Sequence, residues 1–414
     1  MNTMITKFRA FALFACLSLL AGLAACSGQV VPTRAPTLAP SLTSRPTSTS
    51  TRMPTVVPVT VTSTPIPPTA TPGIPSAADW TADLAAALDA WAANDQFSGA
   101  ALVAQDEDVL LEAAYGLADR AQNLPNQVDT KFNLGSMNKM FTAVSILQLM
   151  EAGKLSLDDT LLQHLPDYPN PEVAAQVTIH QLLTHTSGLG DVFTDEFIQD
   201  PHRYRSNADY LPLFVNEPLL FKPGEEFSYS NAGFVVLGLI IEKVSGQSYD
   251  EYVQQHIFDP SGMADSGAFA IDANIPNLAT GYTTRDFMGN ELDALTSNSG
   301  MIPVKGFAAG GGYSSVEDLL RFRHALWGYK LLSAASTELL TTGKVEMGPI
   351  TRYSYGFMDR NAGGERVVGH TGGAPGICSF LYMYPDSGYT VVVLTNNDDG
   401  CALVLDYLKE KPPK

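Results

Sequence analysis

Ser136 and Lys139 are the residues whose types and spacing point most directly to chemistry. They stand three positions apart in the segment 133–150, where Lys139 is the one charged residue and apolar side chains cover nearly the whole circumference of an expected helix. Residues three apart on a helix share a face, so the hydroxyl and the amine can meet near its first turn. Burial lowers the pKa of a lysine, so we expect Lys139 to act as a base that activates Ser136 for acyl transfer.

The same two residues also have a purely structural interpretation. A serine often caps the N-terminus of a helix, and a buried lysine can extend its amine to water. A Ser-x-x-Lys pattern occurs by chance about once in a chain of this length. The catalytic interpretation therefore requires partner residues elsewhere in the sequence.

Tyr229 and Asn231 stand where a second apolar helix is predicted to begin, which runs to Val244. A tyrosine at this position can relay a proton, and an asparagine amide can bind a substrate carbonyl. An ordinary helix start with an Asx cap explains the same residues without chemistry.

A third group, His370-Thr371-Gly372, precedes two strand-like runs at 379–384 and 389–395. We expect a glycine-rich edge strand here, which lets a substrate approach closely and directs N–H groups at an oxyanion. His185 lies in a polar, turn-rich segment at 182–189. For His185 we favour a histidine held by backbone groups in a tight loop over a base for Ser136.

Several further elements are predicted from local patterns. A hairpin is expected at 99–105 and 109–116, tight backbone packing at the glycines 310–312, and a Ser-x-x-Glu capping box at 314–317. Helices are expected at 80–94, 158–168, 178–184, 316–327 and 402–409. The hairpin at 99–116 thus precedes the helix that carries Ser136.

Ser136-x-x-Lys139, Tyr229-x-Asn231 and His370-Thr371-Gly372, in this order, resemble the motifs of the serine β-lactamase and penicillin-binding-protein superfamily. The similarity spans about residue 78 to the C-terminus. It is greatest to the class C β-lactamase-related branch, which includes D-aminopeptidases, D-Ala-D-Ala carboxypeptidases and carboxylesterases. The resemblance implies an α+β fold, in which helices flank an antiparallel β-sheet and a helical subdomain is inserted roughly between residues 155 and 300.

The resemblance also implies a role for each motif residue. Ser136 is the expected nucleophile, Lys139 and Tyr229 share the proton transfers, and the N–H groups of Ser136 and Gly373 form the oxyanion hole. Substrate binding falls to Asn231, His370, Thr371 and Gly372. Acylation of Ser136 would be followed by attack of water on the ester.

His370 departs from the usual pattern of the superfamily, whose third motif generally begins with a lysine that helps to hold a substrate carboxylate. A histidine is mostly neutral at pH 7 unless a partner raises its pKa. The lack of a fixed positive charge disfavours an efficient β-lactamase. A histidine at the start of the third motif resembles the D-aminopeptidase and esterase members of the superfamily. His370 is expected to hydrogen-bond the substrate or to assist proton transfer.

Composition excludes several other functions. The 414 residues carry a formal net charge of −18, and all 43 acidic residues lie at or after Asp79, which argues against nucleic-acid binding. The scattered histidines and the lack of Cys-x-x-Cys predict no metal site and no cofactor. Cys378 and Cys401 either form a disulfide in an oxidising compartment or remain two buried thiols.

The N-terminal region reads as an export signal and a tether. Residues 1–25 combine basic residues with an apolar run, and Leu-Ala-Ala-Cys at 23–26 resembles the lipobox of bacterial lipoproteins, which implies a lipid anchor at Cys26. An ordinary secretory signal that contains a cysteine is the alternative. Residues 26–75 are rich in Pro, Thr and Ser and predict an extended tether, and the hydrolase domain is predicted at 76–414.

The sequence therefore predicts an exported, lipid-anchored serine hydrolase that acts on a small ester or peptide substrate and faces the extracytoplasmic side. Cell-wall D-Ala peptides and β-lactams are the alternative substrates. A non-catalytic sensor that is acylated without turnover is the alternative from another functional class.

Overall fold

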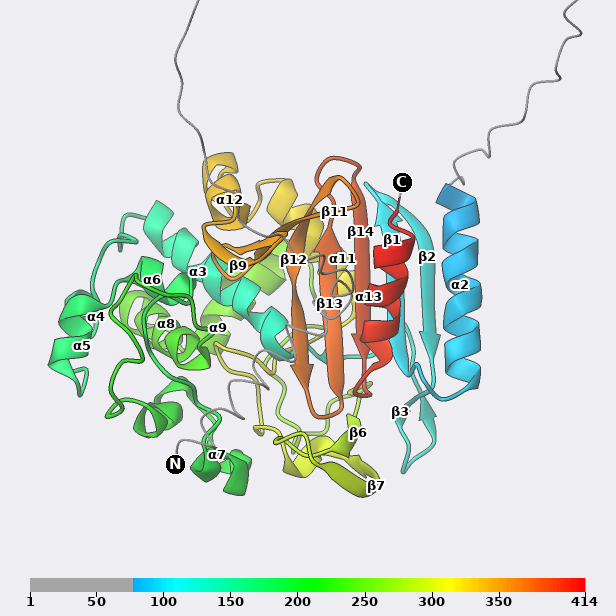
Figure 1. Cartoon of the computed structure of the whole chain (residues 1–414), viewed down its shortest axis with the longest axis horizontal. Coiled ribbons are helices and arrows are strands. Elements are labelled where there is room, and N and C mark those ends of the chain that lie inside the picture. Colours follow the sequence, from blue (N-terminus) through cyan, green and yellow to red (C-terminus); the bar gives the residue numbers. More distant parts are fainter. Residues whose placement is uncertain (1–76, 414) are drawn as a thin grey trace, which may run out of the picture. The chain divides into compact units, whose positions relative to one another are not determined.

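An antiparallel sheet forms the centre of the fold (Figure 1). The computed structural model describes residues 77–413, so the predicted signal, Cys26 and the tether lie outside the described residues. Within residues 77–413 the sheet has eight strands. In sheet order they are β2 (Asp108–Tyr115), β1 (Gly99–Gln105), β14 (Tyr389–Thr395), β13 (Ile377–Met383), β12 (Glu365–Ala374), β11 (Met358–Ala362), β10 (Thr351–Tyr353) and β9 (Val345–Gly348).

Helices of the described region flank this sheet or form a separate cluster beside it (Figure 1). No helix within residues 77–413 has the length and apolar character needed to cross a bilayer. The helices are α2 (Ala77–Ala93), α3 (Lys139–Glu151), α4 (Leu161–His164), α5 (Pro171–Gln176), α6 (Ile179–Leu183), α7 (Asp195–Gln199), α8 (Asn231–Ser245), α9 (Tyr249–Val253), α10 (Asp259–Ser261), α11 (Val316–Trp327), α12 (Ala334–Thr341) and α13 (Gly400–Glu410).

The central strands are apolar because both faces of the sheet are covered. Alternate residues of β1 enter two different cores: Ala101 and Val103 pack with Trp80 of α2, whereas Ala100 and Leu102 pack in the core that also contains α3. Every residue of β14 is buried, as expected for a strand between two helical layers. The structure confirms the predicted α+β fold with an antiparallel sheet flanked by helices.

The region 155–300, for which a helical subdomain is predicted, contains α4 to α10. It also contains a hairpin of β6 (Tyr282–Arg285) and β7 (Glu291–Ser297). The helix predicted at 158–168 is too long, because α4 spans only Leu161–His164. Leu165 precedes Pro166, and a residue before proline avoids the helical conformation.

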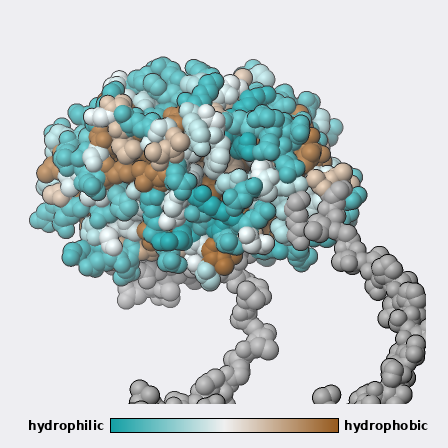
Figure 2. Space-filling view, turned by 90° about the horizontal axis from the view of Figure 1, so that it is seen from above, coloured by the Kyte–Doolittle hydropathy of each residue, from teal (hydrophilic) through white to brown (hydrophobic). Residues whose placement is uncertain are grey.

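Other local predictions agree with the structure to within a few residues. The first hairpin forms from β1 and β2, and the last from β13 and β14. The Ser-x-x-Glu capping box predicted at 314–317 is wrong, because Ser315 caps α11 by accepting a hydrogen bond from the backbone N–H of Asp318, and Glu317 pairs with Arg321. Hydrophilic residues cover most of the face shown in Figure 2, and the hydrophobic ones lie in separate areas.

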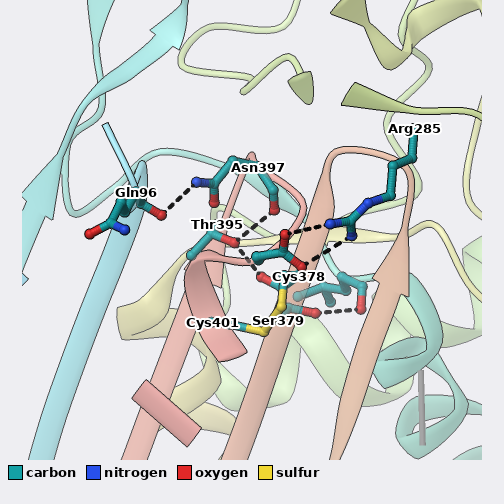
Figure 3. Close-up of a disulfide and its surroundings, with 9 residues drawn as sticks. Gln96, Arg285, Cys378, Ser379, Thr395, Asn397 and Cys401 are labelled. Carbon is teal, nitrogen blue, oxygen red and sulfur yellow. Dashed lines mark hydrogen bonds and ion pairs between the residues drawn. A yellow bond between two sulfur atoms is a disulfide. The ribbon is translucent and has the colours of Figure 1, made fainter. Parts of the chain in front are cut away.

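Cys378 of β13 and Cys401 of α13 form a disulfide, with their Cα atoms 5.4 Å apart (Figure 3). This bond resolves the two alternatives that the sequence left open. Around it, the Thr395 hydroxyl donates a hydrogen bond to the carbonyl of Cys378. The disulfide therefore fixes the last helix against a strand at the centre of the sheet.

Replacing both cysteines, Cys378→Ala with Cys401→Ala, is expected to lower the free energy of unfolding by about 3 kcal/mol, because the bond closes a loop of intermediate length in the unfolded chain. Urea titration followed by circular dichroism measures the loss. A reductant should destabilise the parent protein by a similar amount and leave the double variant unaffected. Equal stability of the parent and the double variant would show that the bond contributes nothing.

Candidate active site

Ser136 lies in a turn of 3-10 helix, Gly135–Asn138, that leads directly into α3. The sequence predicted one continuous helix within 133–150 that opens on the serine, whereas the α-helix begins at Lys139 and the serine lies in the 3-10 turn before it. In a 3-10 turn the side chains of residues i and i+3 eclipse one another, and the predicted contact is still made. The Nζ atom of Lys139 lies 3.2 Å from Oγ of Ser136.

Lys139 begins α3, and its side chain has no exposed surface. Its amine reaches two carbonyl oxygens besides the serine: Oδ1 of Asn231 at 2.7 Å and the backbone oxygen of Ala309 at 2.5 Å. Carbonyl oxygens only accept hydrogen bonds, whereas the serine hydroxyl can also donate. A neutral amine can therefore donate to Asn231 and Ala309 and turn its lone pair toward Ser136.

Asn231 is the first residue of α8, and its amide has a fixed orientation. Its Nδ2 atom lies 3.1 Å from each carboxylate oxygen of Asp191, so its Oδ1 atom faces Lys139. The cap of α8 is Ser230, whose hydroxyl accepts the N–H of Gly233, and not Asn231. The expected contact of Asn231 with substrate stays a prediction.

Sequence reasoning did not identify Asp191. Its carboxylate accepts hydrogen bonds from the backbone N–H groups of Val192 and Phe193 as well as from Asn231. Burial raises the pKa of Asp191, while these hydrogen bonds and the charge of Lys139 act in the opposite direction. The available signal was an acidic residue two positions after the polar, turn-rich segment 182–189.

Tyr229 lies beside the lysine, with Nζ of Lys139 4.9 Å from the centre of its ring. The ring packs on His185, whose ring centre is 4.2 Å away. His185 has a positive φ of 57°, and its Nδ1 atom accepts the backbone N–H of Ser230. The favoured interpretation of His185, a histidine satisfied by backbone groups in a tight loop, is confirmed for Nδ1, whereas Nε2 is buried without a hydrogen-bond partner in the described region. A proton-transfer role for Tyr229 stays a prediction.

His370 lies on β12 with 1% of its surface exposed. Its Nδ1 atom is 2.6 Å from the carbonyl oxygen of Thr371, and its Nε2 atom is 3.0 Å from the hydroxyl of Tyr353. Because a carbonyl only accepts, Nδ1 carries the hydrogen and Nε2 accepts from Tyr353. Burial, together with the charge of Lys139, lowers the pKa of His370 to about 3, so the ring is neutral at pH 7.

The glycine-rich strand was predicted to be an edge strand, but β12 lies inside the sheet. Its pairing with β11 begins at Gly369, so residues 370–374 pair with β13 and leave their other side open to the site. A local edge thus exists within an interior strand. The expected substrate contacts of Thr371 and Gly372, which lie on this segment, stay predictions.

Close backbone packing brings the open segment of β12 to the serine. A Cβ atom on Gly372 would collide with the carbonyl oxygen of Leu134, and one on Gly135 would come within 2.8 Å of the backbone nitrogen of Gly373. Glycine at both positions therefore allows the Gly373 amide to lie beside the Ser136 turn. The oxyanion hole of Ser136 and Gly373 stays a prediction that this geometry supports.

A second backbone segment, 307–309, holds α3 from the other side. Asn138, Thr142 and Lys139 donate hydrogen bonds to the successive carbonyls of Phe307, Ala308 and Ala309. Next to it, the N–H of Gly311 donates to the carbonyl of Gly135 over 3.1 Å. The tight packing expected of this glycine segment is confirmed, whereas the carbonyl that Ala309 offers to Lys139 has no side-chain signature in the sequence.

The chain is similar to known proteins over most of the described region. The family model described as Beta-lactamase matches residues 83–409. "Penicillin-binding protein 4*" of Bacillus subtilis is 33% identical over 315 residues, which are 73% of this chain and 69% of that protein. The crystal structure of a penicillin binding protein from Bacillus halodurans superposes with a TM-score of 0.72 at 38% identity and covers 78% of this chain and 98% of the other.

Amide-cleaving enzymes share the fold. A D-stereospecific amidohydrolase from Streptomyces sp. is 27% identical with a TM-score of 0.66, over 78% of this chain and 97% of that one. The family match covers well over half of the sequence and includes Ser136, Lys139, Tyr229, Asn231 and His370. This chain belongs to the beta-lactamase family, whose members are serine hydrolases and penicillin-binding-protein relatives.

Proposed function

We propose that this protein is an exported serine hydrolase that cleaves a small ester or amide through an acyl-Ser136 intermediate. The observation that carries the proposal is the fully buried amine of Lys139, 3.2 Å from the Ser136 hydroxyl and within hydrogen-bond distance of two carbonyl oxygens. Two acceptors occupy the amine hydrogens, so the remaining lone pair is directed at the serine proton. This arrangement supports a neutral lysine base.

The proposed reaction has two stages. Ser136 attacks the acyl carbon while its proton passes to Lys139, and the N–H groups of Ser136 and Gly373 stabilise the oxyanion. The alcohol or amine leaves after it receives a proton from Lys139 or Tyr229. Water then attacks the acyl-serine ester, and the same groups accept its proton.

The electrostatics of the site favour an uncharged acyl group over a carboxylate-bearing substrate. His370 occupies the position of the third motif, and it is neutral with both ring nitrogens already bonded to protein atoms. It therefore supplies no positive charge to hold a substrate carboxylate. The D-stereospecific amidohydrolase of related fold supports an amide as one form of substrate, and cell-wall D-Ala peptides and β-lactams remain the alternatives.

The disulfide supports export, since such bonds persist in oxidising compartments and are rare in reducing ones. The predicted signal at 1–25 and the lipobox at Cys26 are the sequence basis for a lipid anchor at the membrane. The tether at 26–75 would hold the catalytic body at a distance from that membrane.

Ser136→Ala and Lys139→Met are each expected to lower kcat for nitrophenyl acetate at least about 1000-fold, because the first removes the nucleophile and the second removes the base from a side chain of similar length. Ser145→Ala is the matched control, since Ser145 lies on the same helix and donates a hydrogen bond to the carbonyl of Phe141. This control should retain activity. An active Ser136→Ala variant with a native circular dichroism spectrum would rule out the proposed nucleophile.

A rate comparison across nitrophenyl acetate, D-alanyl nitroanilide and a chromogenic cephalosporin tests the substrate class. We expect steady turnover of the uncharged ester, with kcat/KM at least about 10-fold above that of the cephalosporin, which corresponds to one lost charge-assisted hydrogen bond. A faster cephalosporin reaction would contradict the uncharged-substrate proposal. A single burst of nitrophenol, stoichiometric with protein, would indicate the acylated sensor instead.

Cys26→Ala is expected to move the protein from the membrane fraction to the soluble extracytoplasmic fraction, because the proposed lipid attachment is lost. Immunoblotting of separated fractions measures the distribution. Cys16→Ala is the matched control, since Cys16 lies in the apolar run and outside the lipobox, and this variant should stay with the membrane. Membrane retention of the Cys26→Ala variant would refute the anchor.

A further inference from the structure

Asp191 lies one side chain away from Lys139, on the segment between α6 and α7. Its Oδ1 atom accepts the backbone N–H of Val192 at 2.7 Å and of Phe193 at 3.3 Å. The amide nitrogen of Asn231 lies 3.1 Å from both carboxylate oxygens, and the backbone nitrogen of Asn231 lies 3.5 Å from Oδ2. Each of these neighbours donates a hydrogen bond, which suits an ionised carboxylate.

The carboxylate decides which way the Asn231 amide points. An ionised carboxylate only accepts, so Asn231 must turn Nδ2 toward it, and Oδ1 then faces the amine of Lys139. If the amide were reversed, its Nδ2 would face Lys139 and would compete with Ser136 for the lone pair of a neutral amine. The orientation of one amide therefore determines whether the lone pair of Lys139 is available to the serine.

We propose that Asp191 is a positioning residue that acts through Asn231 to direct the amine lone pair of Lys139 toward Ser136. The inference rests on the proposed function, because it assigns the base of that reaction its orientation. Within the described residues no hydrogen bond joins Asp191 to Ser136, so its effect on the serine passes through Asn231. A second contact supports the rigidity of its segment: the hydroxyl of Ser230, at the start of α8, donates a hydrogen bond to the carbonyl of Gly190 over 2.6 Å.

The other titratable groups near Lys139 are Tyr229, whose ring lies beside the amine, and His185 and His370, on whose pKa values its charge acts. Tyr353 of β10 contacts both histidines. Burial and the charge of Lys139 lower the pKa of both histidines, so neither is charged at pH 7. Among these groups of the described region, Asp191 supplies the negative charge. Its removal makes the ammonium form of Lys139 less favourable, so the active neutral amine persists to lower pH.

Asp191→Asn is the sharpest test. If the new side chain keeps its oxygen on the N–H groups of Val192 and Phe193, its NH2 group takes the place of Oδ2, 3.1 Å from Nδ2 of Asn231. Two donors then face each other, and this contact favours reversal of the Asn231 amide. We expect the rate at which a fluorophosphonate probe labels Ser136 to fall at least about 100-fold, the scale of losing an oriented base. The acid limb of the rate against pH should move to lower pH.

The double variant Asp191→Asn with Asn231→Asp exchanges the two side chains, so that a hydrogen-bond donor at position 191 again faces an acceptor at position 231. The new amide donates to the new carboxylate, whose other oxygen accepts from Lys139. We expect labelling at high pH to recover at least about 10-fold over the single variant. The acid limb should now lie above that of the parent, because the carboxylate touches the amine directly and stabilises the ammonium form.

Asp318→Asn is the matched control, since Asp318 is a buried carboxylate that accepts hydrogen bonds from Ser266 and from the backbone of Asp265, outside the site. It should lower stability and leave both the labelling rate and its pH profile unchanged. Labelling of the Asp191→Asn variant at the parent rate with the parent pH profile overturns the inference. A low rate without either the pH shift or the rescue also overturns it, since this outcome indicates a merely structural role.

The probe separates this inference from the proposed function. Its serine adduct forms by displacement of fluoride at phosphorus, so labelling does not depend on the natural substrate or on hydrolysis of an acyl ester. A parent protein that is not labelled at Ser136 contradicts the activated serine itself. A labelled parent with an equally reactive Asp191→Asn variant contradicts the positioning role alone.

Discussion

A lysine amine enclosed by protein must find hydrogen-bond acceptors within the protein, and this requirement organises the site. Lys139 meets it with the side chain of Asn231 and the backbone of Ala309. These two acceptors come from α8 and from the glycine-containing segment before α11, far from Lys139 in the sequence. The position of the amine relative to Ser136 thus depends on three separate parts of the chain packing together in the core.

Backbone packing without side chains is the second requirement. Gly135 and Gly372 stand where any side chain would collide with the opposite backbone, so the turn of Ser136 and the open segment of β12 can approach directly. On the other side of that turn, Gly311 donates a hydrogen bond to Gly135. The serine is therefore held between the sheet and the 307–312 segment, and its place follows from glycine positions as much as from its own helix.

The predictable part of this protein is the part that is encoded locally. The apolar run of α3, the Ser136–Lys139 spacing and the two hairpins could be identified because each depends on residues close in sequence. Asp191 and Ala309 could not be identified in this way. Asp191 is recognisable as a site residue through a contact with Asn231, 40 positions away, and Ala309 contributes a carbonyl that every residue type possesses. The end of α4 at His164 follows from Pro166 and was therefore encoded locally, although the predicted helix overran it. The interior place of β12 depended on long-range strand pairing.

The amide of Asn231 between Lys139 and Asp191 has a consequence that a direct ion pair would not have. A carboxylate in contact with the amine would stabilise the ammonium form, and a protonated lysine has no lone pair with which to accept the serine proton. The asparagine between them is oriented by the carboxylate, because Nδ2 must face the acid and Oδ1 then faces the amine. It also increases the distance between the two charges and so weakens their attraction.

His370 is likewise surrounded by neutral groups, because the hydroxyl of Tyr353 and the carbonyl of Thr371 form hydrogen bonds with its ring nitrogens without adding charge. The surroundings of Lys139 thus orient the amine through neutral hydrogen-bonding groups and keep formal charges at least one side chain away.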